Sequence, residues 1–256
     1  MSRIRQPRVA EIVASRLRDD ILSGRLAEGD ILPTQDGLLQ EFGVSPPALR
    51  EAIHLLETDG LVSVRRGNVG GAVVRLPSAA RTAQMISMVL QTRSATPADV
   101  SAALLHLEPI CAGMCATRED RKTEVVPYLQ QEIDRQAAQF DDASQYVPNA
   151  RRFHEALVSR CGNEPMILLI GSLELIWSAH ESSVWTGEGE TAGAEIFPTT
   201  MRAALRDHRR LLDAITDGDA ARATKIAANH LTVARRTTLA VGSDKTIEAR
   251  LISNDR

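Results

Sequence analysis

The sequence predicts a mainly α-helical protein in which three helices and a β-hairpin precede an all-α bundle. Apolar residues recur at helical spacing along most of the chain. One stretch, LVSVRRGNVGGAVVRL at 61–76, alternates instead in two short runs around glycines, which is typical of a hairpin. Aromatic residues make up only 3% of the chain while alanine is abundant, and this composition favours closely packed helices over a β-sandwich.

Charge and cysteine content limit the class of protein. The net charge is −3, and residues 1–77 carry ten arginines against ten acidic residues, so this part has no net charge. Any nucleic-acid site must therefore be a local basic patch. The three cysteines form no CxxC pair, and no apolar stretch approaches the ~20 residues of a membrane span or forms a signal region. These features predict a cytoplasmic protein with no membrane partner.

The first domain is predicted at residues 1–77. A helical stripe over 9–22 is followed by a turn-rich connector, and TQDGLLQEFG at 34–43 is predicted as a short second helix. After a tight turn, a third helix is expected over 45–60. Three helices followed by a hairpin is the order of a winged helix-turn-helix.

The start of the third helix contains two consecutive prolines. Ser45 is the expected N-cap, so Pro46 and Pro47 take the first two helical positions, where an amide hydrogen has no partner within the helix. The apolar stripe is then Leu49, Ala52, Ile53 and Leu56. Arg50 projects from the other side, where a recognition helix meets base edges and an arginine donates two hydrogen bonds to guanine. The alternative is that Arg50 pairs with a neighbouring carboxylate.

The second domain is predicted at 78–240, followed by a polar, frayed tail at 241–256. Its helices are expected at about 79–93, 97–118, 121–141, 145–162, 164–184, 197–217 and 219–238. No strand pattern interrupts them, which indicates an all-α bundle.

The segment LPTQDGLLQEFGVSPPALREAIHLLETDGLVSVRRGNVGGAVV resembles the winged helix of the GntR transcription factors, over residues 9–75. The resemblance implies a homodimer on a pseudo-palindromic, double-stranded DNA operator. It also implies a set of residues that lie against DNA: Ser45, Pro47, Arg50, Arg66 and Gly67. Arg65 and Arg66 would neutralise phosphates. Many members carry arginine at the positions of Asp36 and Pro46, so base readout in this chain is expected to depend heavily on Arg50.

Three further motifs resemble the FCD branch of that family, which has a ligand-sensing helical domain. They are RRFHEALVSRCGN, RDHRRLLDAITDGDAARA and AANHLTVARR, preceded by LEPICAGMCA at 107–116. The resemblance implies that His154, His208 and His230 form a site for a divalent metal of the Zn or Ni type, or for the effector itself. Members commonly add an aspartate four residues before the first histidine, where this chain has Ala150.

Three interpretations of the histidines remain open. They bind metal together with a water or an effector carboxylate, they bind the effector directly without metal, or they are ordinary core residues. A small carboxylate is the expected effector, although the arginine that often precedes the LEP glutamate is replaced by Leu104, with His106 as the nearest polar residue. The arginines near the pocket helices are interpreted as surface charges: Arg151, Arg152, Arg206, Arg209 and Arg210.

The function predicted from these observations is a DNA-binding transcriptional regulator, most simply a repressor relieved by its effector. Two rivals remain. One is a dimeric DNA-binding module with a degenerate sensor. The other is a metal-dependent hydrolase, since catalytic zinc often has three histidine ligands. The hydrolase does not account for the winged helix.

Overall fold

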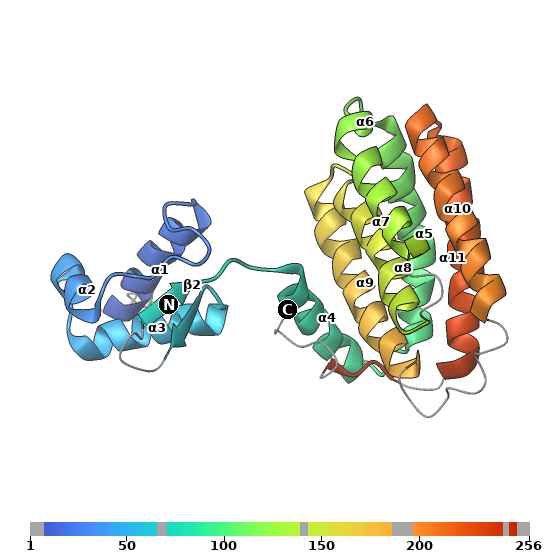
Figure 1. Ribbon diagram of the computed structural model, residues 1–256. Coiled ribbons are helices and arrows are strands. Elements are labelled where there is room, and N and C mark those ends of the chain that lie inside the picture. Colours follow the sequence, from blue (N-terminus) through green and yellow to red (C-terminus); the bar gives the residue numbers. More distant parts are fainter. Residues whose placement is uncertain (1–7, 66–70, 139–142, 186–196, 243–245, 250–256) are drawn as a thin grey trace, which may run out of the picture. The chain divides into compact units, whose positions relative to one another are not determined.

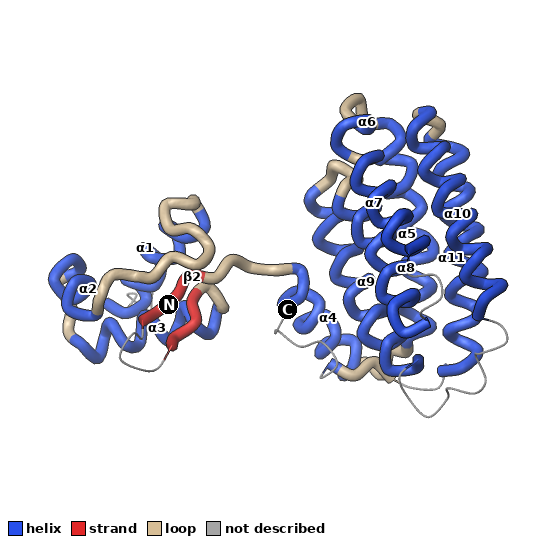
Figure 2. Tube along the Cα trace, viewed as in Figure 1, coloured by secondary structure: helices blue, strands red, loops and turns tan. Residues whose placement is uncertain are grey.

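The computed structural model describes residues 8–65, 71–138, 143–185, 197–242 and 246–249. The chain divides into two compact units between Ser78 and Ala79, beside the expected boundary at 77. Helices dominate both units, and the described strands form one small antiparallel sheet (Figures 1 and 2). The predicted fold class is confirmed.

The first unit has the predicted order of elements. It contains α1 (Val9–Leu22), α2 (Gln35–Phe42), α3 (Pro46–Asp59), β1 (Val62–Arg65) and β2 (Gly71–Val74). The two strands pair antiparallel, with Val62 opposite Val74 and Arg65 opposite Gly71. The guanidinium of Arg18 on α1 forms an ion pair with Asp59 at the end of α3, which joins the first and third helices.

The connector between α1 and α2 adds a third segment to the hairpin. Ile31 forms an isolated antiparallel bridge with Val73. The amide of Leu32 donates to the carbonyl of Ala72 at 2.8 Å, and that of Val74 donates to the carbonyl of Asp30 at 2.8 Å. Backbone hydrogen bonds therefore anchor the hairpin to this connector.

The buried stripe of α1 differs from the apolar stripe that the sequence indicates, which is Val9, Ile12, Val13, Leu17, Ile21 and Leu22. Val9, Ile12 and Leu22 are more than half exposed, and two alanines take part in the core instead. The core of this unit gathers Ala10, Val13, Ala14, Leu17, Ile21, Leu38, Leu49, Ala52, Leu56, Leu61 and Val74. Small residues at 10 and 14 let α1 approach α3 closely, whereas the pattern of large apolar residues alone does not indicate this contact.

The second unit is an all-α bundle. Its helices are α4 (Ala79–Thr92), α5 (Pro97–Thr117), α6 (Arg121–Glu124), α7 (Val126–Ala138), α8 (Ala143–Ser159), α9 (Glu164–Trp185), α10 (Phe197–Asp217) and α11 (Ala220–Gly242). The single helix expected over 121–141 is wrong, because the structure breaks it at Val125. Pro127 has no amide hydrogen for the preceding turn, so it belongs in the first turn of a new helix.

Helix α5 lies at the centre of the bundle, in contact with α8, α9, α10 and α11. Among the described helices it alone has the length and mean hydropathy of a membrane span, and half of that window is buried inside the bundle. A Cβ on Gly113 would meet Thr224 Oγ1 at 2.5 Å, so α5 and α11 pack closely. Residues on α5 are thus placed at the heart of the domain.

Part of the expected polar tail is docked rather than frayed. Ile247 is buried in the core of the second unit, and its amide donates to the carbonyl of Ala95 at 2.9 Å. The amide of Ala249 donates to Gln91 Oε1 at 3.0 Å. This segment therefore covers the carboxyl end of α4. The sequence did not predict this contact, because Ile247 is an isolated apolar residue in a polar stretch.

Candidate histidine centre and nucleic-acid interface

Helix α3 begins where the double proline predicts. Ser45 is the N-cap residue, with an extended backbone, and its carbonyl accepts the first helical hydrogen bond from Leu49 at 3.1 Å. The Ser45 hydroxyl makes no capping bond, contrary to expectation. Pro47 occupies the second helical position and has no amide hydrogen to donate. Ser45, Pro46 and Pro47 are all exposed, so the amino end of α3 is open to a partner.

Arg50 is exposed on the same end of α3, opposite the buried side chains of Leu49 and Ala52. Within the described part of the chain, no carboxylate pairs with its guanidinium. The alternative in which Arg50 serves a surface ion pair therefore finds no support. Its donors are available to a ligand that meets the amino end of the helix.

The hairpin tip is only partly described. Arg65 is the last residue of β1, and the predicted contacts Arg66 and Gly67 lie outside the described residues. The sheet register places the two strand ends next to each other at Arg65 and Gly71.

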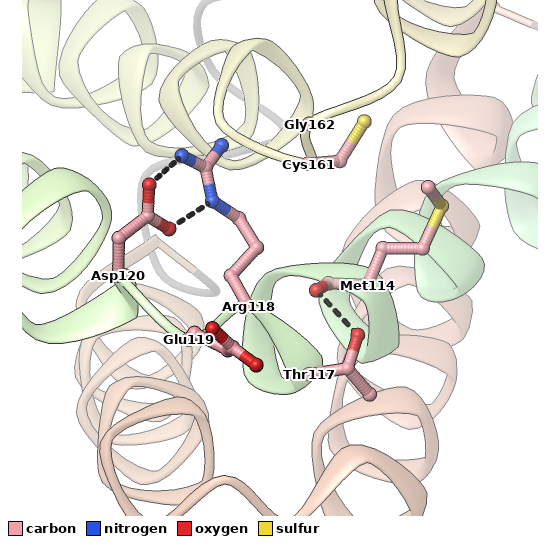
Figure 3. A pocket seen from close by; sticks show the side chains of 7 residues that line it. All are labelled: Met114, Thr117, Arg118, Glu119, Asp120, Cys161 and Gly162. Carbon is pink, nitrogen blue, oxygen red and sulfur yellow. Dashed lines mark hydrogen bonds and ion pairs between the residues drawn. The ribbon is translucent and has the colours of Figure 1, made fainter.

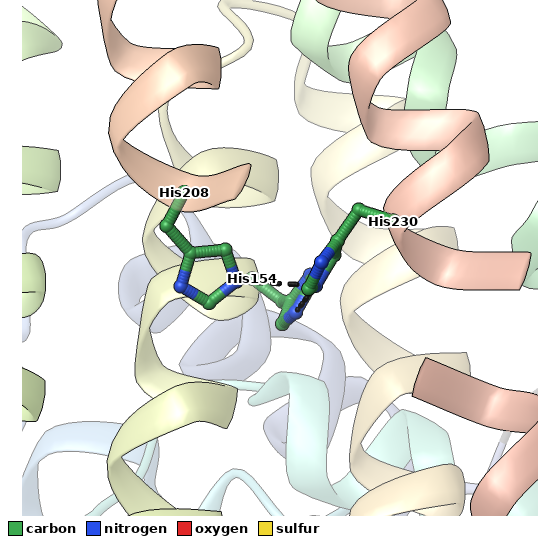
Figure 4. Close-up of side chains that lie close together, drawn as sticks. All are labelled: His154, His208 and His230. Carbon is green, nitrogen blue, oxygen red and sulfur yellow. Dashed lines mark hydrogen bonds between the residues drawn. The ribbon is translucent and has the colours of Figure 1, made fainter. Parts of the chain in front are cut away.

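The three predicted histidines come together in the second unit (Figure 4). His154 lies on α8, His208 on α10 and His230 on α11. The Nε2 atoms of His208 and His230 are 3.2 Å apart, and those of His230 and His154 are 3.4 Å apart. All three rings are buried or nearly so, and Phe153 stacks on His208 with ring centroids 3.9 Å apart. The prediction that the three histidines converge is confirmed.

Each imidazole has an oxygen facing its other nitrogen. Nδ1 of His154 contacts Glu108 Oε1 at 2.5 Å, and Nδ1 of His208 contacts Gln136 Oε1 at 2.8 Å. Nδ1 of His230 is 3.8 Å from Asp207 Oδ2. The first two contacts are hydrogen bonds, and they favour the tautomer with the proton on Nδ1 and a free lone pair on Nε2 for His154 and His208. At 3.8 Å, Asp207 is too far from His230 to form a hydrogen bond.

Burial disfavours the charged form of two of these imidazoles, those of His154 and His208. Desolvation, followed by the neighbouring His230, lowers the pKa of His154 to about 3. Burial likewise lowers the pKa of His208 well below its usual value. Neutral imidazoles are the form that ligates metals.

The donor set fits a divalent transition metal. Two nitrogens that each lie ~2.0–2.1 Å from a tetrahedral ion are separated by about 3.3 Å. The observed separations of 3.2 and 3.4 Å match this edge. Without a proton or a cation between them, converging lone pairs at these distances would repel. Ala150, one turn before His154, supplies no ligand.

A buried network of ionic side chains adjoins the histidines. Glu108 Oε2 is 3.3 Å from Arg235 Nη2, which also lies 2.7 Å from Glu174 Oε1. The other oxygen of Glu174 accepts from Arg151 Nη2 at 2.7 Å. All four side chains are at most 8% exposed.

The interpretation of Arg151 as a surface charge is wrong, because its side chain is buried in this network. Glu174 and Arg235 were missed, although a lone glutamate in the apolar run LLIGSLELIW was a usable signal.

Other residues discussed in the sequence analysis take no part in the histidine cluster. Leu104 is buried, whereas His106 is exposed on α5 and belongs to no cluster with the histidines. Burial raises the pKa of Cys111 and of Cys115, which fits their interpretation as core residues.

A separate cavity of about 570 Å³ lies where α5 meets the start of α6 (Figure 3). Its lining residues are Met114, Thr117, Arg118, Glu119, Asp120, Cys161 and Gly162. Arg118 is already held there by Asp120, through hydrogen bonds of 2.8 and 2.7 Å. The cavity includes none of the histidines.

Known proteins resemble both parts of the chain. A family model described as bacterial regulatory proteins of the gntR family matches residues 9–73, and an FCD domain model matches residues 99–233. This chain belongs to the GntR family and carries an FCD domain. The HTH-type transcriptional regulator Mce2R of Mycobacterium tuberculosis is 28% identical over 240 residues, which cover 91% of this chain and 92% of the relative.

Other GntR proteins extend the comparison. The HTH-type transcriptional repressor NanR of Klebsiella aerogenes is 24% identical over 93% of this chain and 88% of its own length. The solved structure of Streptococcus agalactiae GntR has a TM-score of 0.68 at 20% identity, covering 89% of this chain and 99% of that chain, and shows the shared fold. The protein is a GntR-family transcriptional regulator and not an enzyme, so the hydrolase alternative is set aside.

Proposed function

We propose that this GntR protein is a homodimeric repressor whose FCD domain releases it from a pseudo-palindromic operator when a metal-assisted effector binds. The single observation that carries the sensing role is the convergence of three imidazoles, two of which are oriented by a hydrogen bond from Nδ1 to Glu108 or Gln136. Ordinary core histidines have no need to point their lone pairs at one another. NanR, a relative along most of the chain, is named as a repressor.

The proposed DNA contacts are Ser45, Pro47, Arg50, Arg65, Arg66 and Gly67. The base-reading part of this set is supported by the exposed amino end of α3 and by the guanidinium of Arg50, which no carboxylate of the described residues pairs. The arginines of the hairpin would add phosphate contacts, which strengthen binding without reading sequence. Because its target is DNA, we place the protein in the cytoplasm.

The proposed ligands of a zinc- or nickel-type ion are His154, His208 and His230. Such an ion supplies Lewis acidity and positive charge, and three protein ligands leave positions open for an effector oxygen. A small carboxylate fits this role because it brings both an oxygen ligand and a negative charge. A relative from Escherichia coli, 27% identical over 95% of this chain, is named for regulating an L-lactate dehydrogenase operon, which supports an organic acid as the effector class.

Zinc titration of metal-stripped protein tests the sensing role. Wild-type protein should bind one Zn²⁺ per chain in calorimetry, and His208→Ala should lose this binding. His106→Ala, which removes an exposed histidine of the same domain, should bind like wild type. Equal binding by His208→Ala and wild type would place zinc elsewhere.

Selection of bound DNA from a random pool tests the regulatory role. The selected sites should contain two related half-sites, and a zinc–carboxylate mixture should weaken binding to them. Binding that zinc and carboxylates leave unchanged would favour the remaining rival, a dimeric module with a degenerate sensor.

A further inference from the structure

The three cysteines of the chain lie in one part of the bundle core and take no part in the proposed sensing chemistry. Cys111 and Cys115 are one turn apart on α5, and Cys161 lies in the turn between α8 and α9. All three are free thiols, and all three are buried. The Cys115 thiol donates to the carbonyl of Leu157 on α8 at 3.3 Å, so this face of α5 packs against the end of α8.

The thiols of Cys111 and Cys161 form a pair. Burial, followed by the electrostatic effect of Cys161 and a side-chain hydrogen bond between the two residues, raises the pKa of Cys111. Burial also raises the pKa of Cys115 to about 12, with a further contribution from Cys161. Both thiols on α5 therefore stay protonated and uncharged at neutral pH, and Cys161 is the neighbour that they share.

Cys161 connects this thiol pair to solvent. It lines the cavity of about 570 Å³ at the end of α5, beside Met114 and Gly162 (Figure 3). A cavity of this size is in the range that holds small organic molecules. Cys161 belongs to a turn and not to a helix, so its side chain can move without distorting α8 or α9. A reagent in the cavity reaches Cys161 directly, whereas Cys111 is fully buried.

The uncharged, buried state of the thiols selects the kind of ligand. Zinc and copper(I) bind thiolates, and burial opposes the loss of a proton from these thiols. A trivalent arsenical reacts with neutral thiols instead: an oxide R–As=O and two S–H groups give R–As(S–)₂ and one water molecule. Two As–S bonds form, both thiol protons leave in the water, and the arsenic stays trivalent. The product is uncharged, so no charge is buried.

We propose that Cys111 and Cys161 form a dithiol site that binds trivalent arsenicals, separate from the histidine centre. The site goes beyond the proposed function and does not depend on it, because the lining of the cavity includes none of the three histidines. A bound arsenic atom would join α5 to the turn between α8 and α9. The two sulfurs act as a chelate, so the pair binds far more tightly than either thiol alone.

Titration of the reduced, full-length protein with phenylarsine oxide tests the site. Wild-type protein should bind one equivalent per chain, seen in the mass of the intact adduct, and competition with a small dithiol gives the affinity. Cys111→Ala and Cys161→Ala should each weaken binding by roughly 100-fold or more, because each removes half of the chelate. Cys115→Ala removes a buried thiol of the same cluster and should bind like wild type, as should His208→Ala.

Two further measurements keep the test independent of how well the variants fold. Circular dichroism and thermal unfolding show whether each alanine variant is folded. Arsenic X-ray absorption of the wild-type complex needs no substitution and should detect two sulfur neighbours. A single sulfur neighbour, equal affinity of wild type and Cys161→Ala, or no binding by wild type would overturn the dithiol site. None of these outcomes involves zinc, so a failure here leaves the proposed sensing function untouched.

Discussion

Glu108 on α5 and His154 on α8 are joined by a 2.5 Å contact between Oε1 and Nδ1, although 46 residues separate them. The second oxygen of Glu108 reaches Arg235 on α11 at 3.3 Å. One carboxylate thus orients a histidine of the centre and also belongs to the buried ionic network. Its removal should affect metal binding and folding together.

Glu108→Gln is expected to weaken zinc binding by roughly 10- to 100-fold, because a neutral amide orients His154 but no longer makes its imidazole more basic. The same change leaves Arg235 with one carboxylate instead of two. Breaking a buried pair costs up to about 3–5 kcal/mol. Calorimetry with zinc and urea unfolding of the metal-free protein measure the two effects.

The matched control is Glu119→Gln, since Glu119 is exposed in the same unit. Both its zinc affinity and its urea midpoint should match wild type. A Glu108→Gln protein that binds zinc as wild type does would show that the Glu108 contact does not tune the site.

Arg50→Ala should strongly lower the preference for the selected operator while leaving thermal stability unchanged. One bidentate arginine–guanine contact contributes about 1–3 kcal/mol of discrimination, which is roughly 5- to 150-fold in relative affinity. Competition binding with operator and scrambled duplexes measures it. Arg16→Ala removes the same charge from an exposed position on α1, and this variant should keep the preference for the operator over scrambled DNA. Retained specificity in Arg50→Ala would refute the base-reading assignment.

Arg66→Ala should lower affinity for operator and scrambled DNA by similar factors. A phosphate contact carries no sequence information, and its loss should reduce the slope of log affinity against log salt concentration by about 0.9. Fluorescence anisotropy at several salt concentrations gives this slope. A loss confined to the operator would mean that Arg66 reads bases instead.

Asp99 should make the stability of α5 depend on acid pH. The amide of Thr96 donates to Asp99 Oδ2 at 2.8 Å, and the Asp99 amide donates to Thr96 Oγ1 at 3.3 Å, forming a capping box. These hydrogen bonds from Thr96 lower the pKa of Asp99 below its usual value. Their stabilising effect is therefore fully present above the ordinary aspartate pKa, and it is lost as pH falls through the lower pKa of the folded state.

Urea midpoints of wild type and Asp99→Asn, measured from neutral pH to pH 2, test this dependence. The wild-type protein should be the more stable at neutral pH, and the difference should vanish at the acid end. Asp213→Asn, at an exposed position within α10, should track wild type throughout. A difference between Asp99→Asn and wild type that persists at pH 2 would contradict the assignment.

Local signals made most of the architecture predictable. The double proline after Ser45 specified the start of α3, because proline is favoured in the first turn of a helix, where an amide hydrogen has no partner within the helix. The same rule at Pro127 was overlooked, and two helices were predicted as one. The buried face of α1 was misassigned because Ala10 and Ala14 pack where larger residues were expected.

The sequence by itself determined the mainly α fold, the winged helix-turn-helix order and the three histidines of the centre. Each follows from spacing within one segment or from motifs of the GntR family. Only the tertiary structure decided that Arg151 and Arg235 are buried while His106 is exposed, and that Glu108 and Gln136 hold the imidazoles. The partners of these buried side chains lie 23 to 127 residues away in the chain. Periodicity shows which side of a helix is apolar, but the partner of a buried polar group depends on how distant helices pack.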